Sequence, residues 1–432
     1  MKKFNLFLTL LLLCLTTHAG AQIFQEGFFL RNYRQAYRIN PALTNEAGFI
    51  GIAEVNYNTR SNVGASAFIY PTENGPVTAF HPSIGNGQFL NQLKDINYQL
   101  GTINANLFAY GFRTNNLYHT LELNVRGLYA GSMPRSIFQF IKAGSSVPNI
   151  DLHGMGAAGQ LYAEAAYGIG INLGDFVSLG ARAKLLVGLL SVEANISRMK
   201  LYMGEHELAA DFLVEGDLTS ETGWRKRLPK GVGAAFDFGV AVYPVEGLTI
   251  SASIVDLGGV FWNYASSAVS EGYVSFTGLP NMTYDQLNAK GLLNQLKTWC
   301  SDWWKELKPE SSKRGMTFRM IPFQVNGGIK YVMPFYDRMN IGAVGQYTTY
   351  AGWPYWEARF GVGVNPLKWL DLTANIGRGS FGAVFGVAGS LCFGNFHIQA
   401  GLQNGFGGSI PYEGTPLQPN SKTITFGLTY DL

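Results

Sequence analysis

The chain has 432 residues, of which 47% are hydrophobic, 14% aromatic and 14% charged, with a formal net charge of +3. So small a positive charge excludes the strongly basic surface that nucleic-acid binding needs. Beyond the N-terminal leader no run of 18 apolar residues predicts a transmembrane helix, so a membrane location would require a β-barrel. The 53 glycines and many aromatic residues suit such a barrel.

The N-terminus predicts a secretory signal peptide over residues 1–21. Two lysines precede the uncharged run Phe4–Leu15, and the small residues Ala19–Ala21 form a cleavage site. The mature chain should therefore begin at Gln22 and leave the cytoplasm. Residues 22–47, which precede the first predicted strand, are too few for a separate globular plug domain.

Alternating apolar and polar residues between turn-forming clusters predict fourteen antiparallel strands. An even number places both termini on the periplasmic side of an outer-membrane barrel. The strands are expected at 48–58, 101–113, 117–130, 158–171, 176–191, 231–243, 247–258, 320–333, 338–350, 355–365, 368–378, 382–393, 395–404 and 422–432.

The connections alternate in length. Short ones follow residues 113, 171 and 243, whereas long ones occupy segments such as 192–230 and 259–319. Short periplasmic turns and long outer loops are typical of outer-membrane barrels. The pattern therefore predicts an all-β transmembrane barrel over 48–432.

The longest outer connection predicts a helix near 283–308. Thr283 and Gln286 have capping-box spacing, and apolar residues recur on one side until Pro309. That side includes Trp299, Trp303 and Trp304, which we expect to bind a ligand at the barrel mouth. A helix that merely caps the rim is an equal alternative.

Two shorter helices are expected in other outer loops, at Phe89–Ile96 and Ser136–Ala143.

The last strand is predicted to close the barrel. Ile424, Phe426, Leu428 and Tyr430 alternate with threonine and glycine, and the strand runs to the C-terminus. A soluble β-sandwich would alternate in the same way, but with its apolar face buried against a second sheet. The signal peptide and the loop lengths favour the barrel.

Charged residues at inward positions of the alternation predict a network in the lumen. Opposite charges in a confined interior favour mutual pairing over an open aqueous pore. The predicted lumen-lining charges are Glu122, Arg126, Glu164, Arg182, Lys184, Asp237, Lys330, Glu357, Arg359 and Asp371.

No motif predicts catalysis, a metal or a cofactor. None of the five mature histidines has a serine or acid at a spacing that singles out a triad, and no His or Cys cluster has metal-ligand spacing. We therefore expect a protein that is not an enzyme. Cys300 and Cys392 are expected at opposite ends of the barrel, without a disulfide between them.

Three stretches resemble known outer-membrane barrels. Asn40–Pro41–Ala42 resembles an element near the mature N-terminus of the FadL family of fourteen-stranded hydrophobic-substrate transporters and of the PorV-like barrels of the type IX secretion system. Ser253–Trp262 (SIVDLGGVFW) and Trp369–Phe381 (WLDLTANIGRGSF) are similar to a domain of unknown function allied to both, over essentially the whole mature chain.

The resemblance implies that residues 22–47 lie in the lumen as a hatch. Pro41 suits an irregular segment, which is tolerated at membrane depth only inside a barrel. The resemblance also implies a channel for small hydrophobic or amphipathic molecules in the outer membrane, in contact with outer-membrane lipid. The alternatives are a secretion-associated or structural barrel that binds partner proteins through its outer loops, and a general diffusion porin.

Overall fold

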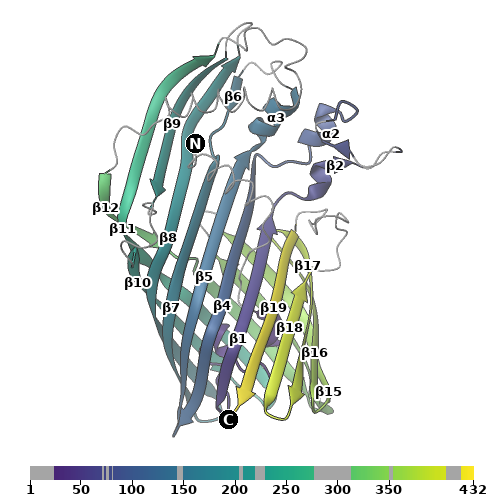
Figure 1. The fold of residues 1–432 in the computed structure, drawn as a ribbon. Helices are drawn as coiled ribbons and strands as arrows, with labels where there is room; N and C mark the ends of the chain where they lie inside the picture. The colour runs from purple at the N-terminus through teal and green to yellow at the C-terminus, as the bar shows by residue number, and fades with distance from the viewer. Residues whose placement is uncertain are drawn as a thin grey trace.

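The structure, a computed structural model, describes residues 24–70, 73, 77–79, 81–143, 149–203, 208–218, 229–276, 313–349, 354–404 and 420–432. Fourteen antiparallel strands within these ranges form a closed barrel (Figure 1). They are β1 (Phe49–Ser61), β4 (Ile96–Thr114), β5 (Leu117–Pro134), β7 (Gly156–Leu173), β8 (Val177–Met203), β10 (Gly231–Val242), β11 (Leu248–Phe276), β13 (Gln324–Met333), β14 (Tyr336–Thr348), β15 (Tyr355–Leu367), β16 (Leu370–Gly379), β17 (Gly382–Phe393), β18 (Phe396–Gln403) and β19 (Asn420–Asp431). The predicted fold class is confirmed.

The first and last strands close the cylinder. Phe49 of β1 pairs with Asp431 of β19 on one side and with Gly111 of β4 on the other. Both neighbours continue the antiparallel pairing along β1, so its backbone is hydrogen-bonded on both sides. Closure removes the open sheet edges that a bilayer does not tolerate.

The two faces of the wall differ sharply. Phe236 and Phe238 of β10 point outward with 47% and 51% of their surface exposed, whereas Asp237 between them is fully buried. The same alternation holds along β19, where Ile424 and Phe426 are exposed. An apolar outer face and a polar inner face are the reverse of a soluble sandwich and suit a lipid environment. The sandwich alternative is therefore wrong.

The wall extends beyond the barrel where long loops were expected. β8 and β11 run past their predicted ends at 191 and 258, and β9 (Leu208–Leu218) pairs with both of them. Figure 1 shows these three strands rising above the rest of the rim. The expected loops at 192–230 and 259–319 are thus partly sheet, because each extended strand gives the next a backbone hydrogen-bonding partner.

A predicted single strand at 320–333 is interrupted. β12 (Lys313–Met320) pairs with the upper part of β11 and β13 with its lower part, and Pro322 lies between them. Proline lacks the N–H that a continuous ladder needs, so the strand breaks there.

The loops at the long-loop end carry short helices. α2 (Asn86–Leu90) is shorter and begins earlier than the predicted Phe89–Ile96, because β4 already starts at Ile96. α3 (Arg135–Ala143) matches its prediction within one residue. Phe68 packs against Phe89 of α2 and Phe138 of α3, with ring centroids 5.6 and 5.4 Å away.

Smaller elements complete this end of the molecule. They are η3 (Ala65–Ala67), β2 (Ile69–Tyr70) and β3 (Val77–Thr78) in the first long loop, and β6 (Asn149–Asp151), which pairs with β8. In the described parts of the chain, no helix has both the length and the hydropathy to cross a membrane. The predicted signal peptide over 1–21 and the predicted helix near 283–308 lie outside the described residues.

Candidate functional site

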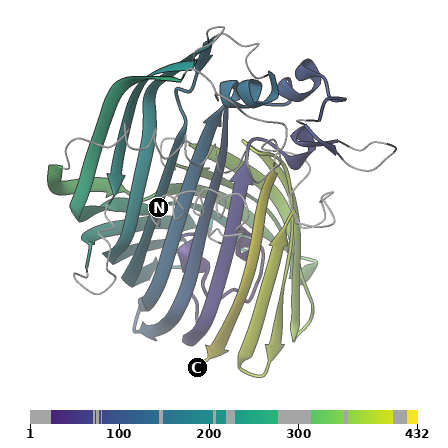
Figure 2. The same cartoon turned by 45° about the horizontal axis from the view of Figure 1, so that its top comes forward.

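Residues 24–47, which we call the hatch segment, cross the lumen near the short-turn end. The segment contains two turns of 3₁₀ helix, η1 (Gln25–Phe28) and η2 (Ala36–Arg38). Its side chains pair with β15 through Glu26, with β1 and β5 through Arg38, and with β19 through Arg34. A segment that contacts strands on all sides of a closed barrel can lie only inside it, and Figure 2 shows its purple turns enclosed by the wall.

The Asn40–Pro41–Ala42 element fixes the hatch segment against one side of the wall. The Asn40 side chain donates hydrogen bonds to the carbonyls of Val240 in β10 (3.0 Å) and Ala252 in β11 (3.1 Å). Its Oδ1 accepts one from the Ala42 N–H at 2.9 Å, which closes a local turn. Pro41 packs so closely on Gly180 of β8 that a Cβ there would lie 2.2 Å from the Pro41 carbonyl carbon. Only glycine permits this approach.

Arg38 joins the hatch segment to the wall by two buried ion pairs. Its Nη1 lies 2.7 Å from Glu54 Oε1 and its Nε lies 2.6 Å from Glu122 Oε1. Glu122 also accepts a hydrogen bond from the Tyr37 hydroxyl at 2.7 Å and pairs with Arg182. Both carboxylates therefore have partners from the hatch segment itself.

The ion pairs continue along the wall as an alternating chain. Arg182 reaches Asp237 at 3.1 Å, and Lys184 joins Asp237 at 2.7 Å and Asp256. Arg126 then joins Asp256 at 2.7 Å and Glu164 at 2.9 Å. We call this set the ion chain: Glu54, Arg38, Glu122, Arg182, Asp237, Lys184, Asp256, Arg126 and Glu164.

The other four predicted lumen charges lie on the opposite wall. Arg359 pairs with Glu357 and with Glu26 of η1. Lys330 and Asp371 instead hold the hatch backbone: Lys330 donates to the Phe28 carbonyl at 3.2 Å, and Asp371 accepts from the N–H groups of Arg31 and Asn32. All ten predicted charges thus lie on the lumen side, six in the ion chain and four around the N-terminal half of the hatch segment.

Strand periodicity missed two wall carboxylates for a physical reason. Asp256 should face outward with Ile254, but it adopts a φ of +66° at a register shift between β10 and β11 that turns it inward. Glu54 follows a similar shift between Gly51 and Ala53 of β1. Arg38 ends the single 3₁₀ turn η2, which is too short for a periodicity to predict the direction of its side chain. At a β-bulge the alternation of inward and outward side chains is interrupted, so sequence periodicity does not predict which way such a residue faces.

An apolar layer fills the lumen above the ion chain, on the side of the long loops. It consists of buried side chains from strands around the barrel and their adjoining segments. Its main members are Leu100, Leu128, Tyr162, Leu186, Val260, Trp262, Ile321, Tyr355 and Phe381. The Tyr98 and Phe381 rings pack edge to face across three intervening strands, with centroids 6.0 Å apart.

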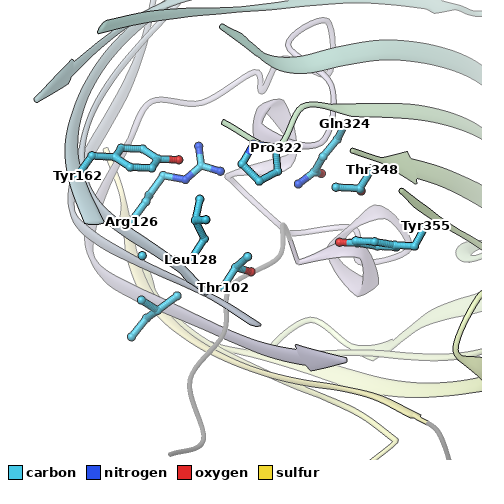
Figure 3. A pocket seen from close by; sticks show the side chains of 10 residues that line it. Thr102, Arg126, Leu128, Tyr162, Pro322, Gln324, Thr348 and Tyr355 are labelled. Carbon is cyan, nitrogen blue, oxygen red and sulfur yellow. The ribbon is translucent and has the colours of Figure 1, made fainter. Parts of the chain in front are cut away.

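A small cavity of about 20 Å³ separates this layer from the ion chain. Figure 3 shows Arg126, Leu128 and Tyr162 on one side of it and Gln324, Thr348 and Tyr355 on the other. The volume is about that of one water molecule. Side chains from opposite walls therefore line one small cavity at this level.

His397 lies between two groups that its sequence spacing did not single out. Its Nδ1 is 3.0 Å from Cys392 Sγ and its Nε2 is 3.0 Å from Asp431 Oδ2. Asp431 also accepts from Arg34 of the hatch segment, so this cluster joins the segment to the end of the last strand. No grouping of His, Cys, Asp and Glu suited to a metal ion occurs within the described ranges.

The described part of the structure does not include Trp299, Trp303, Trp304 or Cys300.

Comparison with family models matches residues 41–402 to a model described as a family of unknown function (DUF5723). The chain belongs to this family. No curated protein matched it.

Among solved structures, similar ones include a Pseudomonas aeruginosa FadL homologue, with 13% identity, coverage of 96% of this chain and 98% of that one, and a TM-score of 0.45. The Pseudomonas putida toluene transporter TodX has 8% identity, coverage of 92% and 93%, and a TM-score of 0.46. The translocator domain of the autotransporter NalP from Neisseria meningitidis has 10% identity, coverage of 91% of each chain and a TM-score of 0.34. At these identities and TM-scores the likeness carries no conclusion about activity.

Proposed function

We propose that this protein is an outer-membrane channel for small hydrophobic molecules, closed at rest by its hatch segment and by the apolar layer above it. The observation that carries the proposal is the lumen itself, in which an apolar layer lies directly above an anchored segment. A general porin needs a clear aqueous path, whereas here side chains and the hatch segment fill the bore. The resemblance of the sequence to FadL-type barrels points the same way.

Ligand binding and conductance test this proposal together. The purified protein in lipid nanodiscs should bind an apolar probe, and in a planar bilayer it should pass little ionic current. Removing residues 24–47 should not by itself open a large current, because the apolar layer still fills the long-loop half of the lumen. A large steady current from the intact chain, without apolar binding, would favour a porin instead.

The aromatic residues Trp299, Trp303 and Trp304 remain our proposed first contact for the ligand. Their triple replacement by alanine should weaken binding of the apolar probe without changing the barrel. Replacing Trp356, an exposed aromatic on the outer face of β15, serves as the matched control. Equal losses in both variants would speak against a loop-borne site.

The second candidate function is a barrel that holds partner proteins at the cell surface. The upper parts of β8 and β11 and the strand β9 favour it, because they project beyond the rim and are not needed to close the barrel. Shortening this extension should abolish partner capture and leave apolar binding intact if the candidate is right. Loss of apolar binding with no captured partner would support the channel.

A further inference from the structure

We propose that the lumen admits uncharged apolar molecules and rejects anionic amphiphiles such as fatty acids, because the cations of the ion chain are already neutralised by the protein's own carboxylates. This inference rests on the proposed channel function and names its substrate class. It follows from the position of one arginine, Arg126, between the apolar layer and the ion chain.

Arg126 is the charged residue among those that line the small cavity below the apolar layer. It lines the small cavity together with Leu128 and Tyr162, and its guanidinium carbon lies 5.8 Å from the centroid of the Tyr162 ring. Its side chain keeps 17% of its surface exposed, more than the other cations of the ion chain. The carboxylate of a ligand that passed the apolar layer would come next to this guanidinium.

Two protein carboxylates already occupy the Arg126 guanidinium. Nη1 and Nη2 form a bidentate pair with Asp256 at 2.8 and 2.7 Å, and Nη1 also contacts Glu164 at 2.9 Å. Bidentate pairing uses the fork of donors that would otherwise bind a ligand carboxylate. An incoming anion would have to displace one of these groups, which would then lie beside a like charge with one cationic partner fewer.

The ion chain as a whole also disfavours the binding of an anionic ligand. It contains five carboxylates and four cations, which makes a net charge of −1. Each cation in it has two carboxylate partners. An anionic head group would therefore be desolvated against a surplus of negative charge, whereas an uncharged one loses nothing of this kind. A cationic head group would still lose its hydration at the edge of the apolar layer.

Three ligands of equal chain length test the selection: decanol, decanoate and decylammonium. Binding to the full-length protein in nanodiscs is measured by equilibrium dialysis at pH 8, with binding to protein-free nanodiscs subtracted. Decanol should bind, and the two ions should bind at least about tenfold more weakly. Decanoate or decylammonium binding as tightly as decanol would overturn the inference and leave the channel standing. Failure of all three to bind would instead count against the proposed function.

Asp256→Asn supplies a gain-of-function test. Asparagine has nearly the same shape and tolerates the positive φ at this position, but it removes one of the two charges that neutralise Arg126. Decanoate affinity should rise severalfold, while decanol affinity stays within about twofold. Asp175→Asn, in an exposed turn at the opposite end, is the matched control and should change neither.

Glu164→Gln provides a second route should the first variant fold poorly. It also removes a partner from Arg126 and should shift selectivity in the same direction. Retained barrel structure is checked by the mobility of unheated samples in gel electrophoresis. Unchanged decanoate binding in a folded variant of either kind would refute the role of the neutralised arginine.

Discussion

The two halves of the lumen are filled by different parts of the chain. Near the short turns, the hatch segment brings Arg38 and Glu26 to complementary charges on the wall, so polar strand faces are matched by a second piece of chain. Near the long loops, side chains of the wall such as Leu186 and Trp262 meet one another with no inserted segment. The packing of the lower half thus requires the insertion of residues 24–47, whereas the packing of the upper half requires only closure of the barrel.

This contrast teaches that the two levels should respond differently to substitution. Loss of one ion partner below leaves a charge buried without compensation, which costs more than the contact itself contributes. Loss of volume above leaves a void that neighbouring side chains fill only in part. The first change should free the hatch segment, and the second should not.

The largest effect is expected for Arg38→Met. It takes from Glu54 the guanidinium with which it pairs and leaves Glu122 paired with Arg182 alone, and the expected loss in the free energy of unfolding is about 3–5 kcal/mol. Denaturant titration of the protein in lipid vesicles measures it. The hatch segment should also become accessible to protease. Protection equal to wild type would mean that the other anchors suffice.

Leu186→Ala should destabilise the upper half by about 3 kcal/mol, because this fully buried side chain leaves a cavity in the apolar layer. The same titration measures the loss, and protease protection of the hatch segment should be unchanged. The control is Leu185→Ala, one residue away on the lipid-facing side, which should cost less than about 1 kcal/mol. Similar costs for both variants would contradict a packed interior.

Asn40→Asp tests how much the Asn40 hydrogen bonds contribute to anchoring the hatch segment. The carboxylate still accepts from Ala42 but cannot donate to the carbonyls of Val240 and Ala252, so about 1–3 kcal/mol of stability should be lost. Hydrogen exchange of the hatch segment reports the local opening. Exchange as slow as in wild type would show that Pro41 packing alone holds the segment.

The smallest effect is expected for Arg34→Gln at the short-turn end. The Arg34–Asp431 pair is about one-fifth exposed on each side, and pairs of this kind contribute about 0–1 kcal/mol. The loss should shrink further in about 1 M salt, which screens exposed charges. A cost that is independent of salt would show that the pair is more enclosed than its exposed surface indicates.

How far the sequence predicted this protein depends on whether the signal was local. Strict alternation, as in Phe236–Asp237–Phe238, assigned the strands and the inward charges because a strand's two faces follow from its own backbone geometry. It failed at the long extensions of β8 and β11 and for the early start of β4, because strand ends are set by the partner strand. The break at Pro322 was local, but alternation alone does not take account of the N–H that proline lacks.

The sequence by itself determined a fourteen-stranded antiparallel barrel with an apolar outside and a charged inside, since periodicity, turn residues and strand number are all readable along the chain. Tertiary structure alone decided which charges meet. The path of Arg38 through the lumen and the bulge at Asp256 join residues 84 and 130 positions apart, and no local pattern records such contacts. Those long-range pairings close the bore and neutralise Arg126.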